Sequence, residues 1–349
     1  MTSKERVLAA CKRQKTDRAP INFQARAELS DRLIDELNLG SQEELLQRLH
    51  VDCRWLQPFY KVGQPTFDAK NLLQVSVFGV KAGLKTLDSG ATVGYFAHRP
   101  LQEARTLDDI LNHDWPGEKD VFIPDFTQQL EDYKDYAVIT GPWTPIFCQG
   151  GFIRGDERLM YDMAAEPEMA KALFDKIFEY YFAVAQKQFE AVKGKADIFF
   201  TGDDFGTQNG LMIGKDMWRE YFFSYYKRLF SLAKDYGLIC MMHSCGAVSE
   251  LYDYFVEAGV DVIDPVQTSA KGMDPSHIKA QYGNKVAFHG GLDMQHLLPF
   301  ADKDTVRKEA LHLIDTLGKG GGYIMCSTNE MLADVPTENI LAAYDAQFE

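Results

Sequence analysis

The chain has 349 residues, of which 46% are hydrophobic, and 51 acidic against 37 basic residues give it a formal net charge of −14. This length can bury a large core without disulfides. The acidic balance and the lack of a Lys/Arg cluster argue against nucleic acid as a partner. There is no signal-peptide core near the N-terminus and no apolar run of ~18 residues, so we expect neither secretion nor membrane insertion. The six cysteines lack CxxC spacing, which is typical of reduced thiols in a cytoplasmic protein.

Short apolar segments rich in β-forming residues alternate with longer segments of helical period. We predict eight strands, at 19–23, 51–56, 136–141, 196–202, 237–244, 260–266, 285–291 and 322–327. Buried strands joined by helices indicate a parallel sheet, and eight such units favour a closed (β/α)8 TIM barrel formed by residues 1–349 as a single domain. An open doubly wound sheet is the alternative, but no GxGxxG follows an early strand.

The segment from about 60 to 125, between the second and third strands, is too long for a simple connection. It contains two alternating pieces, "LLQVSVFGV" and "ATVGYFAH", with "DSG" between them. This pattern predicts a β-hairpin insertion that would cover the barrel mouth.

Polar residues recur where the later strands end, and in a barrel these carboxyl ends form one mouth where chemistry collects. They are Asp203 and Asp204, His243 and Cys245, Asp264 and Gln267, His289 and Asp293, and Cys326, Asn329 and Glu330. Simpler explanations exist for some of them. Asp203 and Asp204 could cap a loop or helix, Asp264 could anchor a strand end, and His289 could be structural or could line a cofactor site.

The stretch "MMHSCG" places His243 and Cys245 two residues apart at the end of the fifth predicted strand. Side chains two apart on a strand point the same way, so both could reach one ion. Zinc favours imidazole and thiolate ligands, and a catalytic site needs three protein ligands. Cys326 is the first candidate for the third, followed by Glu330 and Asp203. The alternative is a hydrogen-bonded histidine beside a buried cysteine that packs as a small hydrophobe.

Several stretches together resemble the uroporphyrinogen decarboxylase superfamily, specifically its branch of cobalamin-dependent methyltransferases. They are "SKERVLAACKRQKTDRAPI", "GDDFGTQNGLMIGKDMWREYF", "MMHSCGAVSELYDYFVEAGVDVIDPVQ", "KVAFHGGLD", "GGGYIMCST" and "DVPTENI". The resemblance implies a zinc ion held by His243, Cys245 and a cysteine after the last strand. The family cysteine aligns with Asn329, while Cys326 stands three residues earlier, so the third ligand stays open among Cys326, Glu330 and Asp203.

The resemblance also implies the reaction, in which a methyl group moves between a small methoxylated compound, methylamine or thiol and the cobalt of a corrinoid. Asp203 or Glu330 would serve as acid or further ligand. Gln267, His289 and Asp293 would contact substrate or corrinoid. The D-x-H-x-x-G segment of corrinoid carriers does not occur in the chain, so we expect a separate corrinoid protein as partner.

Two other functions remain open. A metal-free decarboxylase of the uroporphyrinogen type would hold its many carboxylates with arginines, but "DRAPINFQARAEL" keeps only Gln24, Ala25 and Arg26 of the segment that supplies them. A barrel that binds a tetrapyrrole or metal without turnover is the other possibility. It is disfavoured because carrier sites tend to saturate their metal with four protein ligands.

Overall fold

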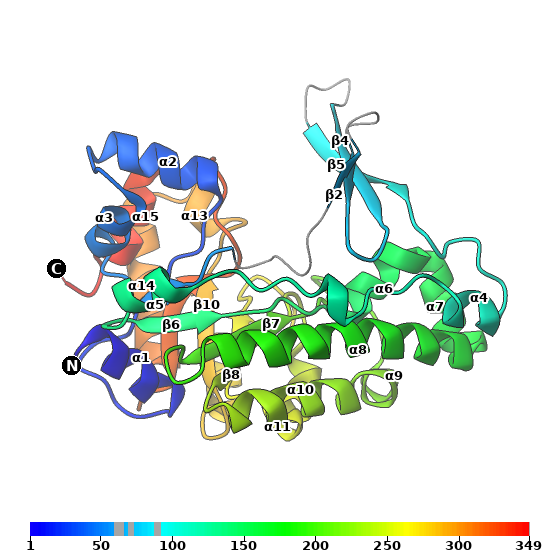
Figure 1. The fold of residues 1–349 in the computed structure, drawn as a ribbon. Coiled ribbons are helices and arrows are strands. Elements are labelled where there is room, and N and C mark those ends of the chain that lie inside the picture. Colours follow the sequence, from blue (N-terminus) through cyan, green and yellow to red (C-terminus); the bar gives the residue numbers. More distant parts are fainter. Residues whose placement is uncertain (59–65, 69–72, 87–91, 349) are drawn as a thin grey trace.

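The computed structural model describes residues 1–58, 66–68, 73–86 and 92–348. A curled parallel sheet forms its centre, with strand order β1-β6-β7-β8-β9-β10-β11 (Figure 1). These strands are β1 Cys53–Trp55, β6 Ala137–Thr140, β7 Ile198–Gly202, β8 Ile239–His243, β9 Val262–Val266, β10 Ala287–Leu292 and β11 Tyr323–Ser327. Each lies within or within one residue of a segment predicted as a strand.

The first predicted strand, 19–23, is reduced to an isolated parallel bridge between Ile21 and Met325. The Asn22 N–H donates to the Met325 carbonyl at 2.9 Å, and the Asp52 N–H donates to the Ile21 carbonyl at 2.8 Å. The segment therefore joins β11 to β1 and closes the barrel. Pro20 has no N–H to extend the ladder, which accounts for the short pairing. The predicted (β/α)8 barrel is confirmed, with one of its eight strands present only as this bridge.

Helices follow the strands as the helical period predicts. They are α1 Ser3–Cys11, α2 Ala27–Glu36, α3 Gln42–Arg48, α4 Leu107–Leu111, α5 Thr127–Asp132, α6 Ile146–Arg154, α7 Asp156–Ala165, α8 Pro167–Ala191, α9 Lys215–Tyr221, α10 Phe223–Asp235, α11 Tyr252–Ala258, α12 Pro275–Tyr282, α13 Leu297–Phe300, α14 Lys303–Leu317 and α15 Thr337–Tyr344, with short 3-10 turns η1 Glu118–Asp120 and η2 Ser249–Leu251. In the part of the chain that the structure describes, no helix is long and apolar enough to cross a bilayer.

Strand alternation divides the apolar residues into two layers. The inward side chains, among them Ile198, Met241, Val262 and Ile324, pack together with Val7 of α1. Helix α1 thus covers the end of the barrel where the strands begin. Two residues further along β8, β9 and β10, at the opposite end of the barrel, the inward positions are polar, as His243, Asp264 and His289 show.

An antiparallel sheet of four strands stands between β1 and β6 in the chain, made of β2 Thr66–Asp68, β3 Leu73–Val75, β4 Lys81–Thr86 and β5 Thr92–His98. The predicted insertion is therefore present, but the predicted pairing is wrong. β5 pairs with β4, whereas 72–80 contains β3 and a turn closed by Ser76 and Val80. The "DSG" turn lies outside the described residues.

The insertion rests on the helices after β6 and projects away from the barrel (Figure 1). Phe96 packs against Phe152 of α6, with 5.0 Å between ring centroids. Phe78 packs edge-on against Tyr180 and Tyr181 of α8. The described part of the sheet is thus anchored on α6 and α8, and the expectation that it covers the barrel mouth stays a prediction.

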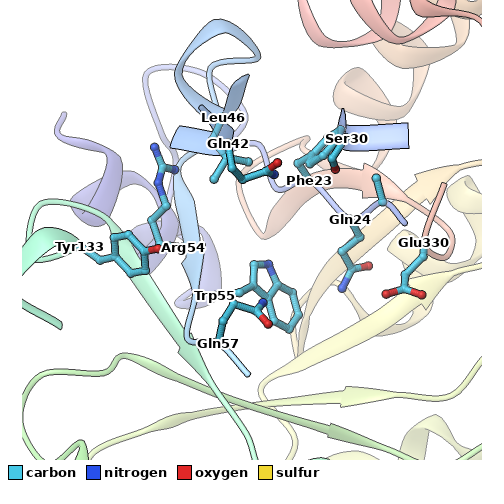
Figure 2. A pocket seen from close by; sticks show the side chains of 11 residues that line it. Phe23, Gln24, Ser30, Gln42, Leu46, Arg54, Trp55, Gln57, Tyr133 and Glu330 are labelled. Atoms are coloured by element: carbon cyan, nitrogen blue, oxygen red, sulfur yellow. The ribbon is translucent and has the colours of Figure 1, made fainter. Parts of the chain in front are cut away.

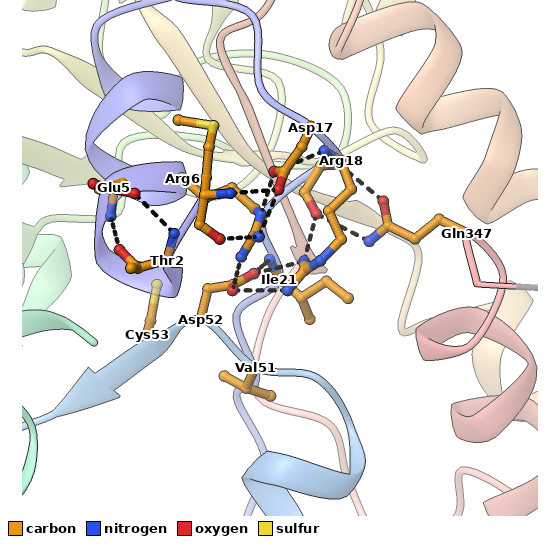
Figure 3. A network of polar contacts seen from close by, with 12 residues as sticks. Thr2, Glu5, Arg6, Asp17, Arg18, Ile21, Val51, Asp52, Cys53 and Gln347 are labelled. Atoms are coloured by element: carbon orange, nitrogen blue, oxygen red, sulfur yellow. Dashed lines mark hydrogen bonds and ion pairs between the residues drawn. The ribbon is translucent and has the colours of Figure 1, made fainter. Parts of the chain in front are cut away.

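A buried ionic network ties the barrel closure to α1 (Figure 3). Asp52 is fully buried and accepts hydrogen bonds from Arg6, Arg18 and the Ile21 N–H at 2.7–2.9 Å. Arg6 also pairs with Asp17, which is 43% exposed. One carboxylate therefore binds α1, the first-strand segment and the start of β1 together.

We expect Asp52→Ala to lower the free energy of unfolding by about 3–5 kcal/mol, because it leaves two guanidinium groups without their buried partner. Asp17→Ala is the matched control and removes the exposed carboxylate of the same network, which should cost about 1 kcal/mol or less. Urea denaturation measures both. Equal losses in the two variants would contradict the assignment of Asp52 as the centre of the network.

Candidate metal centre

Three side chains with metal-binding atoms meet where β7 and β8 end. His243 is the last residue of β8, Cys245 follows two residues later, and Asp204 follows β7. Their ligand atoms all lie within 4.8 Å of one another. The Asp204 Oδ1 atom is 3.6 Å from His243 Nε2 and 3.4 Å from Cys245 Sγ.

These separations match a shared tetrahedral ion. Zinc binds nitrogen, oxygen and sulfur at about 2.0–2.3 Å, which places two tetrahedral ligand atoms about 3.3–3.8 Å apart. Cys245 and Asp204 are partly exposed, so the group faces solvent at the mouth. One imidazole, one thiolate and one carboxylate form a three-ligand set that leaves a fourth position open, as in catalytic zinc sites.

A buried carboxylate holds the imidazole of His243 through its Nδ1 atom. Asp264 of β9 is 1% exposed, and its Oδ2 lies 2.5 Å from His243 Nδ1. Burial lowers the pKa of His243, but the Asp264 charge outweighs burial and raises this pKa well above its ordinary value. Burial likewise raises the pKa of Asp264, yet the two histidines that face it hold this pKa well below its usual range. A carboxylate on Nδ1 directs Nε2 toward the metal position, an arrangement common in zinc sites.

Asp203 is turned away from this group and caps a helix, one of the roles considered for it. It is fully buried and accepts hydrogen bonds from the Phe147 and Cys148 N–H groups in the first turn of α6 and from the Tyr226 hydroxyl. Burial raises its pKa to about 7, although these three hydrogen bonds and a fourth from the Cys148 thiol act in the opposite direction. The structure therefore gives Asp203 a structural position at the N-terminus of α6.

Cys326 does not join His243 and Cys245. It lies in β11, is fully buried, and has the Ser327 hydroxyl 3.9 Å from its sulfur. Among the described residues, the group that could hold an ion consists of Asp204, His243 and Cys245. Asp204 thus occupies the place for which the sequence suggested Cys326, Glu330 or Asp203.

The other residues expected to contact substrate or corrinoid are Gln267, His289 and Asp293. Gln267 accepts a hydrogen bond from the Gly246 N–H at 2.6 Å and so fixes the loop that carries Cys245. His289 is fully buried and hydrogen-bonds to Asp264. Asp293 accepts from the Gln295 N–H and pairs with His296. Each is engaged with protein groups in this structure.

Glu330 lines a separate pocket of about 180 Å³, shown in Figure 2 with Gln24, Trp55 and Tyr133. Its carboxylate pairs with Arg26 at 2.9 Å. The only other charged side chain among the described lining residues, Arg54, pairs with Glu43 at 2.8 Å. Every charge described in the pocket wall is therefore neutralised within the protein.

An aromatic cluster connects this pocket to the candidate metal centre. Trp55, in the pocket wall, packs edge-on against Phe200 with 5.0 Å between ring centroids. Phe200 and Trp143 both pack edge-on against His243, at 6.0 and 5.7 Å. The pocket and the metal centre are thus neighbouring parts of one mouth.

Strand parity could have identified Asp204 from the sequence. Phe200, Gly202 and Asp204 share one face of the fourth predicted strand, as Met241, His243 and Cys245 share one face of the fifth. These strands are neighbours in the barrel, with Gly202 opposite His243. Inward-facing residues beyond adjacent strand ends converge, whereas Asp203 belongs to the opposite face.

One sequence relative of this chain and one solved structure of similar fold are described as methyltransferases. Over an alignment covering 68% of this chain and 60% of the relative, the chain is 26% identical to the methylated-thiol–coenzyme M methyltransferase of Methanosarcina mazei. A solved structure described as a methyltransferase from Methanosarcina mazei has a TM-score of 0.71 at 15% identity and covers 100% of this chain and 98% of that one. This likeness supports the barrel fold.

The other sequence relatives are uroporphyrinogen decarboxylases. The protein from Anaeromyxobacter sp. (strain Fw109-5) is 26% identical over 60% of this chain and 56% of the relative, and the one from Anaeromyxobacter dehalogenans is 24% identical over 98% and 97%. The chain thus spans less than two thirds of the first two sequence relatives. The uroporphyrinogen decarboxylase (URO-D) family model matches residues 128–348, well over half of the sequence. The chain belongs to this family, as its motifs indicated.

The Cys245 loop packs so closely on the loop after β7 that only glycine fits at position 206. A Cβ on Gly206 would lie 2.5 Å from the Cys245 carbonyl oxygen and 2.6 Å from Val248 Cγ1. Gly246 faces it with a φ of +91°. This backbone contact sets the spacing between Asp204 and Cys245.

We expect Gly206→Ala to destabilise the protein by about 1–3 kcal/mol through overpacking and to weaken zinc binding by separating the two loops. Gly210→Ala, in the same loop, is the control, because a Cβ there meets no atom within 4 Å. Thermal unfolding and a zinc titration measure the two effects. A Gly206→Ala protein that binds zinc as tightly as Gly210→Ala would contradict the role of this contact.

Proposed function

We propose that this protein is a zinc-dependent methyltransferase that moves a methyl group between a small methylated substrate and the cobalt of a separate corrinoid protein. The convergence of Asp204, His243 and Cys245 carries the proposal, because these residues form a three-ligand set with zinc spacing at the barrel mouth. Family membership and the methyltransferase relative support the same reaction class.

The chain's residues divide the work by position. His243 Nε2, Cys245 Sγ and an Asp204 oxygen would hold the ion, and Asp264 would keep the imidazole in place. When bound, zinc acts as a Lewis acid that stabilises charge on a leaving oxygen or on a thiol. The aromatic rings of Phe200 and Trp143 pack against His243 and would exclude water from that side of the imidazole, and Trp55 packs behind Phe200.

The pocket beside the site suits a small substrate without net charge. Its volume of about 180 Å³ is below that of a typical pocket for drug-sized ligands. Its two described charges are already paired, and Gln24, Trp55 and Tyr133 offer amide and aromatic contacts. A methoxylated compound, methylated amine or thiol of this size would bind against Trp55, which belongs to the aromatic cluster that borders the metal centre. Glu330 remains a candidate acid at this place.

Uroporphyrinogen decarboxylation fits these residues less well. A substrate with many carboxylates needs arginines to bind it. Arg54 gives its guanidinium to Glu43 and to the Val51 and Cys53 carbonyls, and Arg26 pairs with Glu330. Neither arginine is available to a substrate without breaking these contacts.

The metal content of the purified protein tests the proposal. We expect close to one zinc per chain in the wild type, and loss of most of it in His243→Ala, Cys245→Ala and Asp204→Ala, because each removes one of three ligands. Cys326→Ser is the control and should retain the metal, since Cys326 lies outside the group. If Asp204→Ala retained zinc and Cys326→Ser lost it, the third ligand would be Cys326 and not Asp204.

Activity is tested with reduced cobalamin as the methyl acceptor. The zinc-loaded protein, mixed with Co(I) cobalamin and a panel of methoxylated phenols, methylamines and methylated thiols, should methylate cobalt with at least one donor, seen in the visible spectrum. Cys245→Ala should lower the rate by at least about 100-fold. A metal-free protein that instead decarboxylates uroporphyrinogen would overturn the proposal.

A further inference from the structure

A chain of hydrogen bonds crosses the barrel interior from the pocket wall to the candidate metal ligand. Trp55 Nε1 donates to Asn22 Oδ1 at 3.0 Å, and Asn22 Nδ2 lies 3.0 Å from His289 Nε2. His289 Nδ1 in turn hydrogen-bonds to one oxygen of Asp264, whose other oxygen faces His243. Asn22 and His289 are fully buried and Asp264 nearly so, so water does not interrupt the chain.

The direction of these hydrogen bonds follows from donor chemistry. An indole N–H only donates, so the atom of Asn22 that faces Trp55 must be the amide oxygen. The Phe23 N–H donates to the same oxygen at 2.9 Å. Two donors on one side fix the amide, and the Asn22 NH2 group therefore points at His289.

An amide NH2 group also only donates, so His289 Nε2 must accept and must carry no proton. His289 is then neutral, with its proton on Nδ1, from which it donates to Asp264. A second proton on Nε2 would place two donors 3.0 Å apart in a buried site. Burial lowers the pKa of His289, but the Asp264 charge and then the Cys326 side chain, which also hydrogen-bonds to the ring, outweigh burial and raise this pKa. The Asn22 NH2 group acts against this rise, because it leaves no acceptor for a proton on Nε2.

We infer that Asn22, oriented by Trp55, keeps His289 neutral and thereby leaves the full charge of Asp264 available to His243. Asn22 and His289 are positioning residues, because they act on the metal ligand through Asp264 and touch neither metal nor substrate. The inference rests on the proposed zinc site, which it deepens. It also links the pocket wall at Trp55 to the metal centre through hydrogen bonds.

Asn22→Asp tests the chain with almost no change in shape. A carboxylate at this position accepts from Trp55 and also from His289, so Nε2 should gain a proton and His289 should become a cation beside Asp264. The Asp264 carboxylate would then be partly neutralised by the His289 cation, so it would support His243 less, and His243 would become a weaker ligand. We expect zinc affinity, measured by chelator competition, to fall by about tenfold or more.

Nitrogen-15 NMR of histidine-labelled, metal-free protein reads the tautomer directly. In the wild type we expect His289 with Nδ1 protonated and Nε2 unprotonated, and in Asn22→Asp with both protonated. The control is Asn339→Asp. Asn339 is a buried asparagine that takes no part in this series of hydrogen bonds, and its amide donates to the Leu298 and Ala301 carbonyls. It should leave both the His289 resonances and zinc affinity unchanged, whatever it costs in stability.

The outcomes are separable. A protonated His289 Nε2 in the wild type would overturn the inference without any variant, and so would unchanged zinc affinity in a folded Asn22→Asp protein. Equal loss of affinity in Asn339→Asp would assign the effect to general destabilisation and overturn it as well. A wild type that binds no zinc would instead refute the proposed function and with it the effect of Asn22 on zinc affinity. The tautomer of His289 in metal-free protein would still be measured independently of zinc.

Discussion

The buried carboxylate of Asp264, held between two histidines, is the interaction on which the mouth of this barrel depends. A buried charge is costly unless it is paired and hydrogen-bonded, and Asp264 meets both conditions through His243 and His289. The three residues belong to adjacent strands β8, β9 and β10, so the contact also fixes how the ends of these strands align. Its chemical consequence is that His243 has one nitrogen occupied inside the barrel and the other directed at Asp204.

The two ends of the barrel use charge in different ways. At the end covered by α1, Asp52 is surrounded by Arg6 and Arg18 and serves closure of the fold. At the opposite end the charged groups lie on inward-facing positions next to a pocket, and they leave ligand atoms directed at solvent. Active sites of (β/α)8 barrels typically lie at this end, because the loops there can vary while the strands hold the side chains in place.

Much of this could be predicted from the sequence, because buried strands and helical periods are local patterns. All eight strand positions and the pairing of His243 with Cys245 in one site were within reach of such patterns. The third ligand was missed, because Cys326, Glu330 and Asp203 were chosen for their ligand chemistry near strand ends, whereas the face of the strand on which each residue lies selects Asp204. Asn22 also carried no local signal, since its role depends on Trp55 and His289, 33 and 267 residues away in the chain. The β4–β5 pairing was missed because the apolar alternation of 72–80 outweighed the polar strand that follows it.

X-ray absorption at the zinc edge of the zinc-loaded protein tests the central claim most directly, because it distinguishes sulfur from nitrogen or oxygen neighbours. The account predicts one sulfur neighbour, from Cys245, at about 2.3 Å and the remaining ligands at about 2.0–2.2 Å. In Cys326→Ser protein the spectrum should be the same. Two sulfur neighbours in the wild type, one of them lost in Cys326→Ser, would contradict the Asp204–His243–Cys245 site.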